Sequence, residues 1–275
     1  ATFLAPLLKQ YDWRITFYLG AFLSFIFIPF VYFFVPETIS FLERKRPDNA
    51  LERIQKIMRS LGHPVPDQLP ALDNQTAEPV GVSSLFKGGL AAITILLILA
   101  YFGNVGTYYY FVKWIPTIVA DFGYSASEAT KVLGVISLGG VIGSIAMGII
   151  TRFIPIKAMM VVCLISAAIG VALFPYATET LDSMKQIGFV TGIFIFAAIS
   201  GFFALFASSF PSSLLGSGSG LVLGLGRGGA VLGPMIPGFL FAAGMALENV
   251  ALIMAAGSFL AGVVVLFLRQ DKGKK

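Results

Sequence analysis

The chain has 275 residues, of which 57% are hydrophobic and only 12% charged, and its mean hydropathy is +0.86. A soluble domain carries about twice that share of charge, so the composition excludes a water-soluble globular protein. The net charge of +5 does not indicate a nucleic-acid partner, because the basic residues gather in a few loops between apolar blocks.

Seven apolar blocks follow one another along the chain, each close to the ~20 residues that a helix needs to cross a bilayer. They lie near 14–36, 88–112, 130–150, 156–176, 186–208, 217–243 and 249–268. We therefore predict an all-α membrane protein whose outer surface contacts the lipid bilayer.

Residues 1–36 are interpreted as the end of one membrane helix followed by a complete one. Ala1–Leu8 (ATFLAPLL) is typical of the tail of a helix and not of a signal peptide, because no basic leader precedes it. We expect that further membrane helices precede this sequence in the complete protein.

Residues 37–87 are polar and form a long connector. The first half predicts an amphipathic helix that begins near Asp48, as a possible N-cap, and stops at Gly62. The apolar face of this helix consists of residues at helical spacing, namely Leu51, Ile54, Met58 and Leu61. The second half is a Pro-rich linker.

The basic residues favour one orientation in the membrane. They concentrate in the connector, at Arg152 and Lys157, and in the 269–275 tail, which lie on one side if the spans alternate. The positive-inside rule makes that side cytoplasmic and so places the C-terminus in the cytoplasm. The predicted location is a cell inner membrane or plasma membrane.

Residues 88–268 predict a compact six-helix bundle that contains an internal repeat. The second span carries GGVIGSIAMG (139–148) and the fifth carries GGAVLGPMIPG (228–238), as expected for two equivalent three-helix units. The glycines of the fifth span, at 220, 224, 228, 229 and 233, are spaced for close packing against other helices.

The segments DWRITFYLGAF and VPETISFLERKRPDNALERI resemble the end of the first bundle and the central loop of the Major Facilitator Superfamily. The segments YYYFVKWIPTIVADFGYSASEA with LGGVIG, and FPSSLLGSGSGLVLGLGRGGAVLGP, resemble the aromatic acid:proton symporter branch of that superfamily. The resemblance implies the C-terminal six-helix bundle of that fold, preceded by its sixth helix and the end of its fifth.

The resemblance also implies a function, namely proton-coupled uptake of an aromatic or related organic acid by alternating access. A carrier of sugar or another metabolite on the same fold is the alternative. In the loop where the family has an Asp-Arg pair, Thr151 replaces the acid, while Arg152 and Lys157 remain as candidates for a gating loop. The position where the branch often has another arginine holds Leu215.

Arg227 is the main candidate for binding a substrate. It lies roughly 15 Å along its span, at about 1.5 Å per residue, and is therefore close to the middle of the bilayer. A buried arginine there needs water or a partner. The guanidinium is either a counter-ion for a carboxylate or a structural clamp within the bundle.

The first long span offers a second group of candidates. Asn104 and Tyr108, one turn apart, are expected to line the substrate path, with Tyr109 for ring stacking and Lys113 to guide an anion. A belt of interfacial aromatic residues with a snorkelling lysine is the alternative. Phe203 in the tenth helix, near Phe196 and Ser200, is a further cavity candidate that could equally be packing.

No enzyme, metal or cofactor is expected. The single Cys163 excludes an internal disulfide, and the single His63 lies in a polar loop without partners for a metal site or for a membrane-embedded hydrolase. No acidic residue falls in the middle of a span, so a proton-binding carboxylate is expected in the N-terminal bundle of the same protein.

Overall fold

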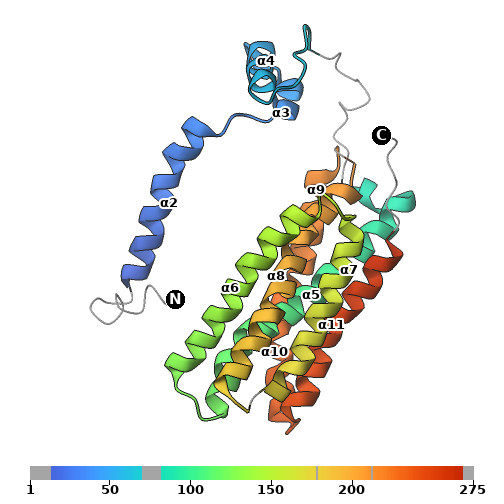
Figure 1. Cartoon of the computed structure of the whole chain (residues 1–275). Helices are drawn as coiled ribbons and strands as arrows, with labels where there is room; N and C mark the ends of the chain where they lie inside the picture. Colours follow the sequence, from blue (N-terminus) through green and yellow to red (C-terminus); the bar gives the residue numbers. More distant parts are fainter. Residues whose placement is uncertain (1–13, 70–81, 178, 212, 269–275) are drawn as a thin grey trace. The chain divides into compact units, whose positions relative to one another are not determined.

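The computed structural model describes residues 14–69, 82–177, 179–211 and 213–268 (Figure 1). These residues form two compact units, 14–69 and 82–268. The predicted helix end at 1–8, most of the Pro-rich linker and the basic tail at 269–275 lie outside the described residues.

The first unit contains the helices α2 (Arg14–Phe34), α3 (Ile39–Lys45) and α4 (Ala50–Ser60). The apolar window Phe17–Phe34 of α2 has no buried residue within its unit. Gly62, with φ of +70°, follows the end of α4 as predicted, because a glycine adopts this left-handed conformation without strain. The N-cap is Asn49 and not Asp48, and its side chain makes no capping bond.

The described part of the second unit begins with the 3-10 helix η2 (Val82–Phe86) and contains seven α-helices. They are α5 (Gly88–Asp121), α6 (Ala126–Ile150), α7 (Ile156–Leu173), α8 (Leu181–Ser209), α9 (Leu215–Gly226), α10 (Gly228–Ala242) and α11 (Leu247–Phe267). A second 3-10 helix, η3 (Phe174–Ala177), follows α7. α5 has 34 residues and is longer than the sequence predicted.

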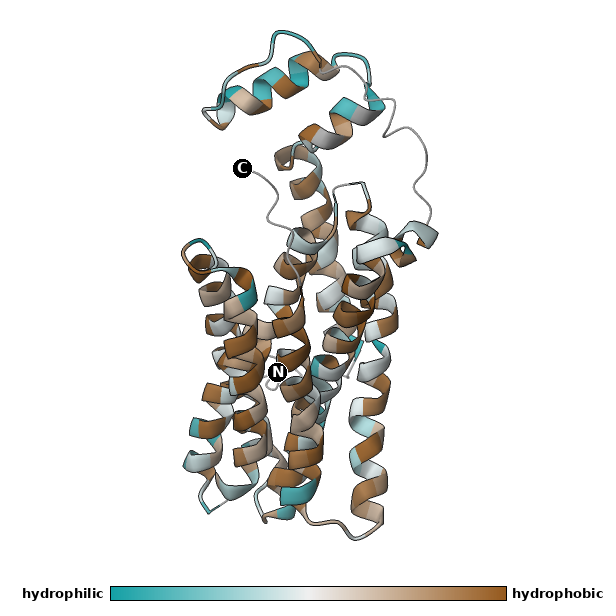
Figure 2. Cartoon of the chain, turned by 90° about the vertical axis from the view of Figure 1, so that its right-hand side faces the viewer, coloured by the Kyte–Doolittle hydropathy of each residue, from teal (hydrophilic) through white to brown (hydrophobic). Residues whose placement is uncertain are grey.

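The described residues contain seven spans long and apolar enough to cross a bilayer, with α9 and α10 counted as one. This confirms the predicted all-α membrane protein. Figure 2 shows apolar residues along most of each helix of the second unit.

Helix pairing in the second unit has the pattern of two equivalent three-helix units. α6 packs on α8 as α10 packs on α5, and α7 packs on α8 as α11 packs on α5, while α7 and α11 pack on each other. Exchanging α5, α6 and α7 for α8, α9–α10 and α11 reproduces this set of contacts. The pattern agrees with the internal repeat predicted from the two glycine segments.

Glycines at the contacts allow the backbones of the paired helices to approach closely. A Cβ at Gly143 of α6 would overlap the backbone carbonyl of Ile193 in α8. A Cβ at Gly233 of α10 would likewise lie 2.5 Å from the Gly106 carbonyl of α5. By contrast, a Cβ at Gly220 or Gly224 would have no heavy atom within 4 Å, so the prediction that these two glycines pack against a helix is wrong within this unit.

α5 and α11 are joined by both close approach and hydrogen bonds. A Cβ at Gly103 would lie 2.6 Å from the Gly257 carbonyl. The Thr107 hydroxyl donates to the Met254 carbonyl (2.6 Å) and accepts from the Ser258 amide (3.0 Å). These two backbone groups are four residues apart in α11, so the hydroxyl of α5 bonds directly to the backbone of one turn of α11.

Replacing Thr107 by valine is expected to destabilise the bundle by about 1 kcal/mol, because a buried hydroxyl that bridges two helices is lost. For a bundle of this size that corresponds to a fall in Tm of about 3 °C in detergent. The matched control is Thr130→Val, since Thr130 is exposed and, within the part of the chain that the structure describes, its hydroxyl bonds only to the Ala126 carbonyl of its own helix. An equal fall in both variants would contradict the bridging role.

Candidate functional site

The span that contains Arg227 is interrupted at that residue. α9 ends at Gly226 after 12 residues, and α10 begins at Gly228 and continues for 15. The Arg227 carbonyl accepts from the Ala230 amide (2.8 Å), which is a tighter bond than the usual four-residue spacing of an α-helix. Arg227 is exposed and lies near the middle of the span Leu215–Ala242.

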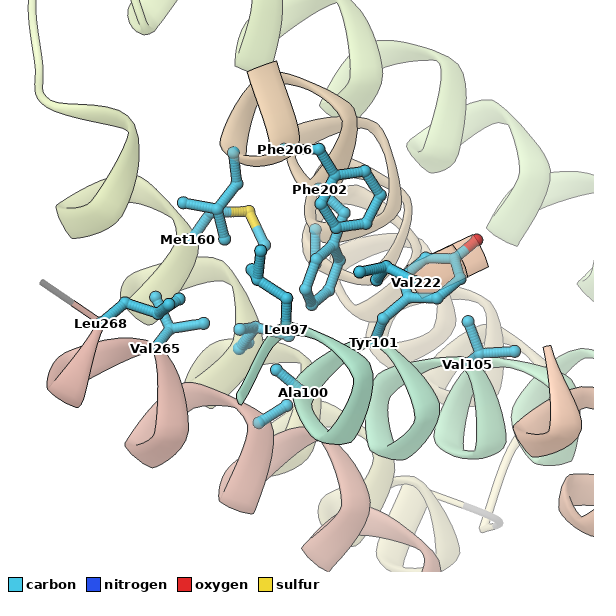
Figure 3. Packing of buried hydrophobic residues seen from close by; sticks show 14 of the residues in the cluster. Leu97, Ala100, Tyr101, Val105, Met160, Phe202, Phe206, Val222, Val265 and Leu268 are labelled. Atoms are coloured by element: carbon cyan, nitrogen blue, oxygen red, sulfur yellow. The ribbon is translucent and has the colours of Figure 1, made fainter. Parts of the chain in front are cut away.

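Tyr101 of α5 is the neighbour of Arg227. The guanidinium interacts electrostatically with the Tyr101 hydroxyl. The Tyr101 ring is 4% exposed and makes edge contacts with Phe202 and Phe206 of α8, with ring centroids 5.2 and 5.7 Å apart. Figure 3 shows the ring beside Val222 of α9, with the hydroxyl at the edge of the apolar cluster.

The ring of Tyr101 fits against α9 because Gly226 has no side chain. A Cβ at Gly226 would overlap the Tyr101 ring. The residue directly before Arg227 thus forms part of the wall that holds the phenol. The two helices are close enough at this point to bring hydroxyl and guanidinium together.

Three further aromatic residues extend this site along α5 and α8. The ring of Tyr108 makes perpendicular contacts with the rings of Tyr109 and Phe196, with both pairs of centroids 5.2 Å apart. Phe196 lies over Gly140 of α6, where a Cβ would come within 2.6 Å of the ring. Tyr109 is within electrostatic reach of both Tyr101 and Tyr108.

We call these five residues the arginine–tyrosine cluster: Arg227, Tyr101, Tyr109, Tyr108 and Phe196. They come from α5, α8 and the junction of α9 and α10. Next to them, one turn from Phe196, the Ser200 hydroxyl donates to the Ser144 hydroxyl of α6 (3.0 Å). The cluster combines one fixed positive charge, three phenols and an aromatic ring that remains half-buried.

Of the residues proposed from the sequence, Tyr108 and Tyr109 are in ring contact, and Tyr109 and Arg227 each interact with Tyr101. Lys113 is exposed and follows Tyr109 by one turn of α5, so it lies on the same side of that helix. Phe203 is 53% exposed and contacts Phe206, and no contact joins it to the cluster among the described residues.

Asn104 does not share the open face with Tyr108. It is fully buried, and its Oδ1 accepts a hydrogen bond from the Ser258 hydroxyl of α11 (3.0 Å). Its Nδ2 has no hydrogen-bond partner among the described residues. A buried amide has to find partners inside the protein, and the one that Asn104 finds lies on the α11 side of α5.

The proposed gating loop lies between α6 and α7. Arg152 is exposed at the end of α6. The Lys157 ammonium donates to the carbonyl of Leu268, the C-cap of α11 (2.8 Å). Lys157 therefore satisfies a helix terminus and joins α7 to α11, a structural contact that the sequence did not indicate.

Sequence reasoning missed Tyr101 and considered Phe196 without selecting it. Tyr101 precedes Tyr108 by seven residues, or two helical turns, and this spacing places both on one side of α5. The spacing could have indicated the residue. Its proximity to Arg227 could not be read from the sequence, because the two residues are 126 positions apart.

Comparison with known proteins decides the family. Residues 1–234 match the family model described as the Major Facilitator Superfamily. The chain belongs to the Major Facilitator Superfamily.

Several relatives are named as transporters of aromatic acids. The chain is 24% identical to the 3-(3-hydroxy-phenyl)propionate transporter of Escherichia coli, over 95% of the chain and 57% of that protein. It is 26% identical to the benzoate transport protein of Acinetobacter baylyi, over 99% and 58%, and 26% identical to the 4-hydroxybenzoate transporter of Pseudomonas aeruginosa, over 95% and 59%. The chain thus spans about three-fifths of the length of these relatives, which confirm the resemblance to the aromatic acid branch.

Proposed function

We propose that the chain forms the substrate-binding bundle of a secondary active transporter that takes up an aromatic or related organic acid together with a proton. The observation that carries this proposal is the position of Arg227, near the middle of a membrane span and next to the phenol of Tyr101, whose ring packs on phenyl side chains of α8. A carboxylate attached to an aromatic ring has the two chemical features that this cluster complements.

The chemistry of the cluster supports an anionic aromatic ligand. A guanidinium presents a planar fork of N–H donors that matches a carboxylate, and its charge cannot be lost at physiological pH. The rings of Tyr108 and Phe196 already pack edge to face, and a ligand ring can join them in the same way. Placing an arginine in the membrane costs at least ~2.5–3.5 kcal/mol of free energy. A role of its charge in substrate binding explains why an arginine is present there.

The proton is proposed to bind elsewhere in the complete transporter. In the described spans, Asp and Glu occur only in the first or last turn, as at Asp121, Glu128, Asp182 and Glu248. We propose that a carboxylate in an N-terminal bundle carries the proton, and that the two bundles alternate access to the site between them. The basic loops would then lie on the cytoplasmic side of a cell inner membrane or plasma membrane.

The test is uptake by the complete transporter that contains this chain, reconstituted in proteoliposomes. Radiolabelled 4-hydroxybenzoate is supplied with and without an inward proton gradient, and protein-free liposomes subtract the passive entry of the neutral acid. We expect saturable uptake that the gradient stimulates, and exchange of external label for internal unlabelled 4-hydroxybenzoate. Uptake of glucose without dependence on pH, and none of 4-hydroxybenzoate, would overturn the proposal in favour of a sugar carrier.

A further inference from the structure

We infer that Tyr101 is a positioning residue, whose hydroxyl holds the Arg227 guanidinium in the orientation that meets the substrate carboxylate. This inference rests on the proposed function of Arg227 and adds to it a residue that does not itself have to touch the substrate. It follows from how firmly the phenol is held and how loosely the arginine is attached.

The phenol is held on three sides by packing. Phe202 and Phe206 contact the Tyr101 ring edge to face from α8, and the backbone at Gly226 closes the side toward α9. With only 4% of the residue exposed, the ring has no room to change its rotamer. Its hydroxyl is therefore held at the edge of the apolar cluster (Figure 3). There it interacts with the Arg227 guanidinium.

Arg227 lies in a far less constrained place. It occupies the junction of α9 and α10, with Gly226 before it and Gly228 and Gly229 after it, and its side chain is exposed. A long exposed side chain loses rotamer freedom when it binds a ligand, and this loss weakens binding. A partner that holds the guanidinium before the ligand arrives removes part of that cost.

The hydrogen-bonding capacity of the two groups allows this arrangement. A guanidinium has five N–H donors and no acceptor, whereas a phenol oxygen can accept a hydrogen bond. One N–H directed at the Tyr101 oxygen leaves a pair of N–H groups free for both oxygens of a carboxylate. The phenol therefore orients the guanidinium without competing with the substrate.

The test compares Tyr101→Phe with Tyr110→Phe in the complete transporter. Tyr110 is on the same helix and is 2% exposed, but it belongs to another part of the apolar core, so this control removes an equally buried hydroxyl. For Tyr101→Phe we expect the KM for 4-hydroxybenzoate to rise at least fivefold, with kcat within twofold of the unsubstituted protein. We expect the KM of Tyr110→Phe to stay within twofold.

A second measurement does not depend on transport. Phenylglyoxal modifies arginine side chains, and mass spectrometry reports its rate at Arg227 separately from the other arginines. We expect Tyr101→Phe to speed modification of Arg227 at least threefold, because the guanidinium is released, and Tyr110→Phe to leave the rate unchanged.

The two measurements separate the inference from the proposed function. An unchanged modification rate in Tyr101→Phe would overturn the inference, whatever the protein transports. A faster rate in a protein that takes up no aromatic acid would support the contact and overturn the proposed function instead. Equal rises in KM for both variants would show that loss of any buried hydroxyl has this effect and would also overturn the inference.

Discussion

Replacing Arg227 by glutamine is expected to lower the kcat/KM for 4-hydroxybenzoate uptake about 100-fold, which corresponds to about 2.7 kcal/mol. Glutamine keeps polarity at the junction of α9 and α10 but has neither the charge nor the fork of N–H groups. The substrate carboxylate would leave water without its counter-ion, and hydrogen bonds to charged groups contribute about 1.5–3 kcal/mol. Uptake into proteoliposomes, normalised to the amount of inserted protein, measures the effect.

A series of variants separates charge from geometry. Arg227→Lys keeps the positive charge and loses the planar fork, so we expect a smaller loss of about tenfold. Arg53→Gln is the matched control, because Arg53 is an exposed arginine of α4 in the other unit, and its uptake should equal that of the unsubstituted protein. Uptake by Arg227→Gln as fast as by Arg53→Gln would show that Arg227 is only a structural clamp.

The second large effect is expected at Gly143, where substitution by valine should prevent correct packing of α6 on α8. The Cβ would overlap the Ile193 carbonyl, and a backbone group cannot rotate away as a flexible side chain does. Overpacking of a tight contact costs about 1–3 kcal/mol or more. We expect a Tm roughly 10 °C lower in detergent, or loss of the monodisperse peak in size-exclusion chromatography.

Gly148 supplies the control on the same helix. No heavy atom lies within 4 Å of a Cβ at Gly148, so Gly148→Val makes the same chemical change without the overlap. Its Tm should remain within about 3 °C of the unsubstituted protein. If Gly143→Val is as stable as Gly148→Val, the contact between α6 and α8 is not as close as described.

The membrane class and the spans could be predicted because they depend on the chain's own composition. A helix of apolar residues is stable in lipid whatever its neighbours are, since it satisfies its own backbone hydrogen bonds. The break at Arg227 was not predicted. The glycines on both sides of it are equally compatible with a continuous helix that packs closely against another.

The orientation of individual residues depended on neighbours distant in sequence. Gly229 and Gly233 face α5, whereas Gly220 and Gly224 face no helix of this unit, although the spacing of both pairs is the same. The spacing of Asn104 and Tyr108 predicts that both line the substrate path, whereas Asn104 bonds to Ser258 of α11. Ser258 is 154 residues away in the sequence, and no local pattern indicates that contact.

The link between α5 and α11 limits how the binding site can rearrange. α5 carries three of the five residues of the arginine–tyrosine cluster, while Thr107 ties it into the backbone of α11. Because of these hydrogen bonds, α5 cannot bend at this point without disturbing α11, and a tilt of α5 would move α11 with it. A change in the orientation of the three tyrosines would therefore be accompanied by a movement of α11, the last helix of the bundle.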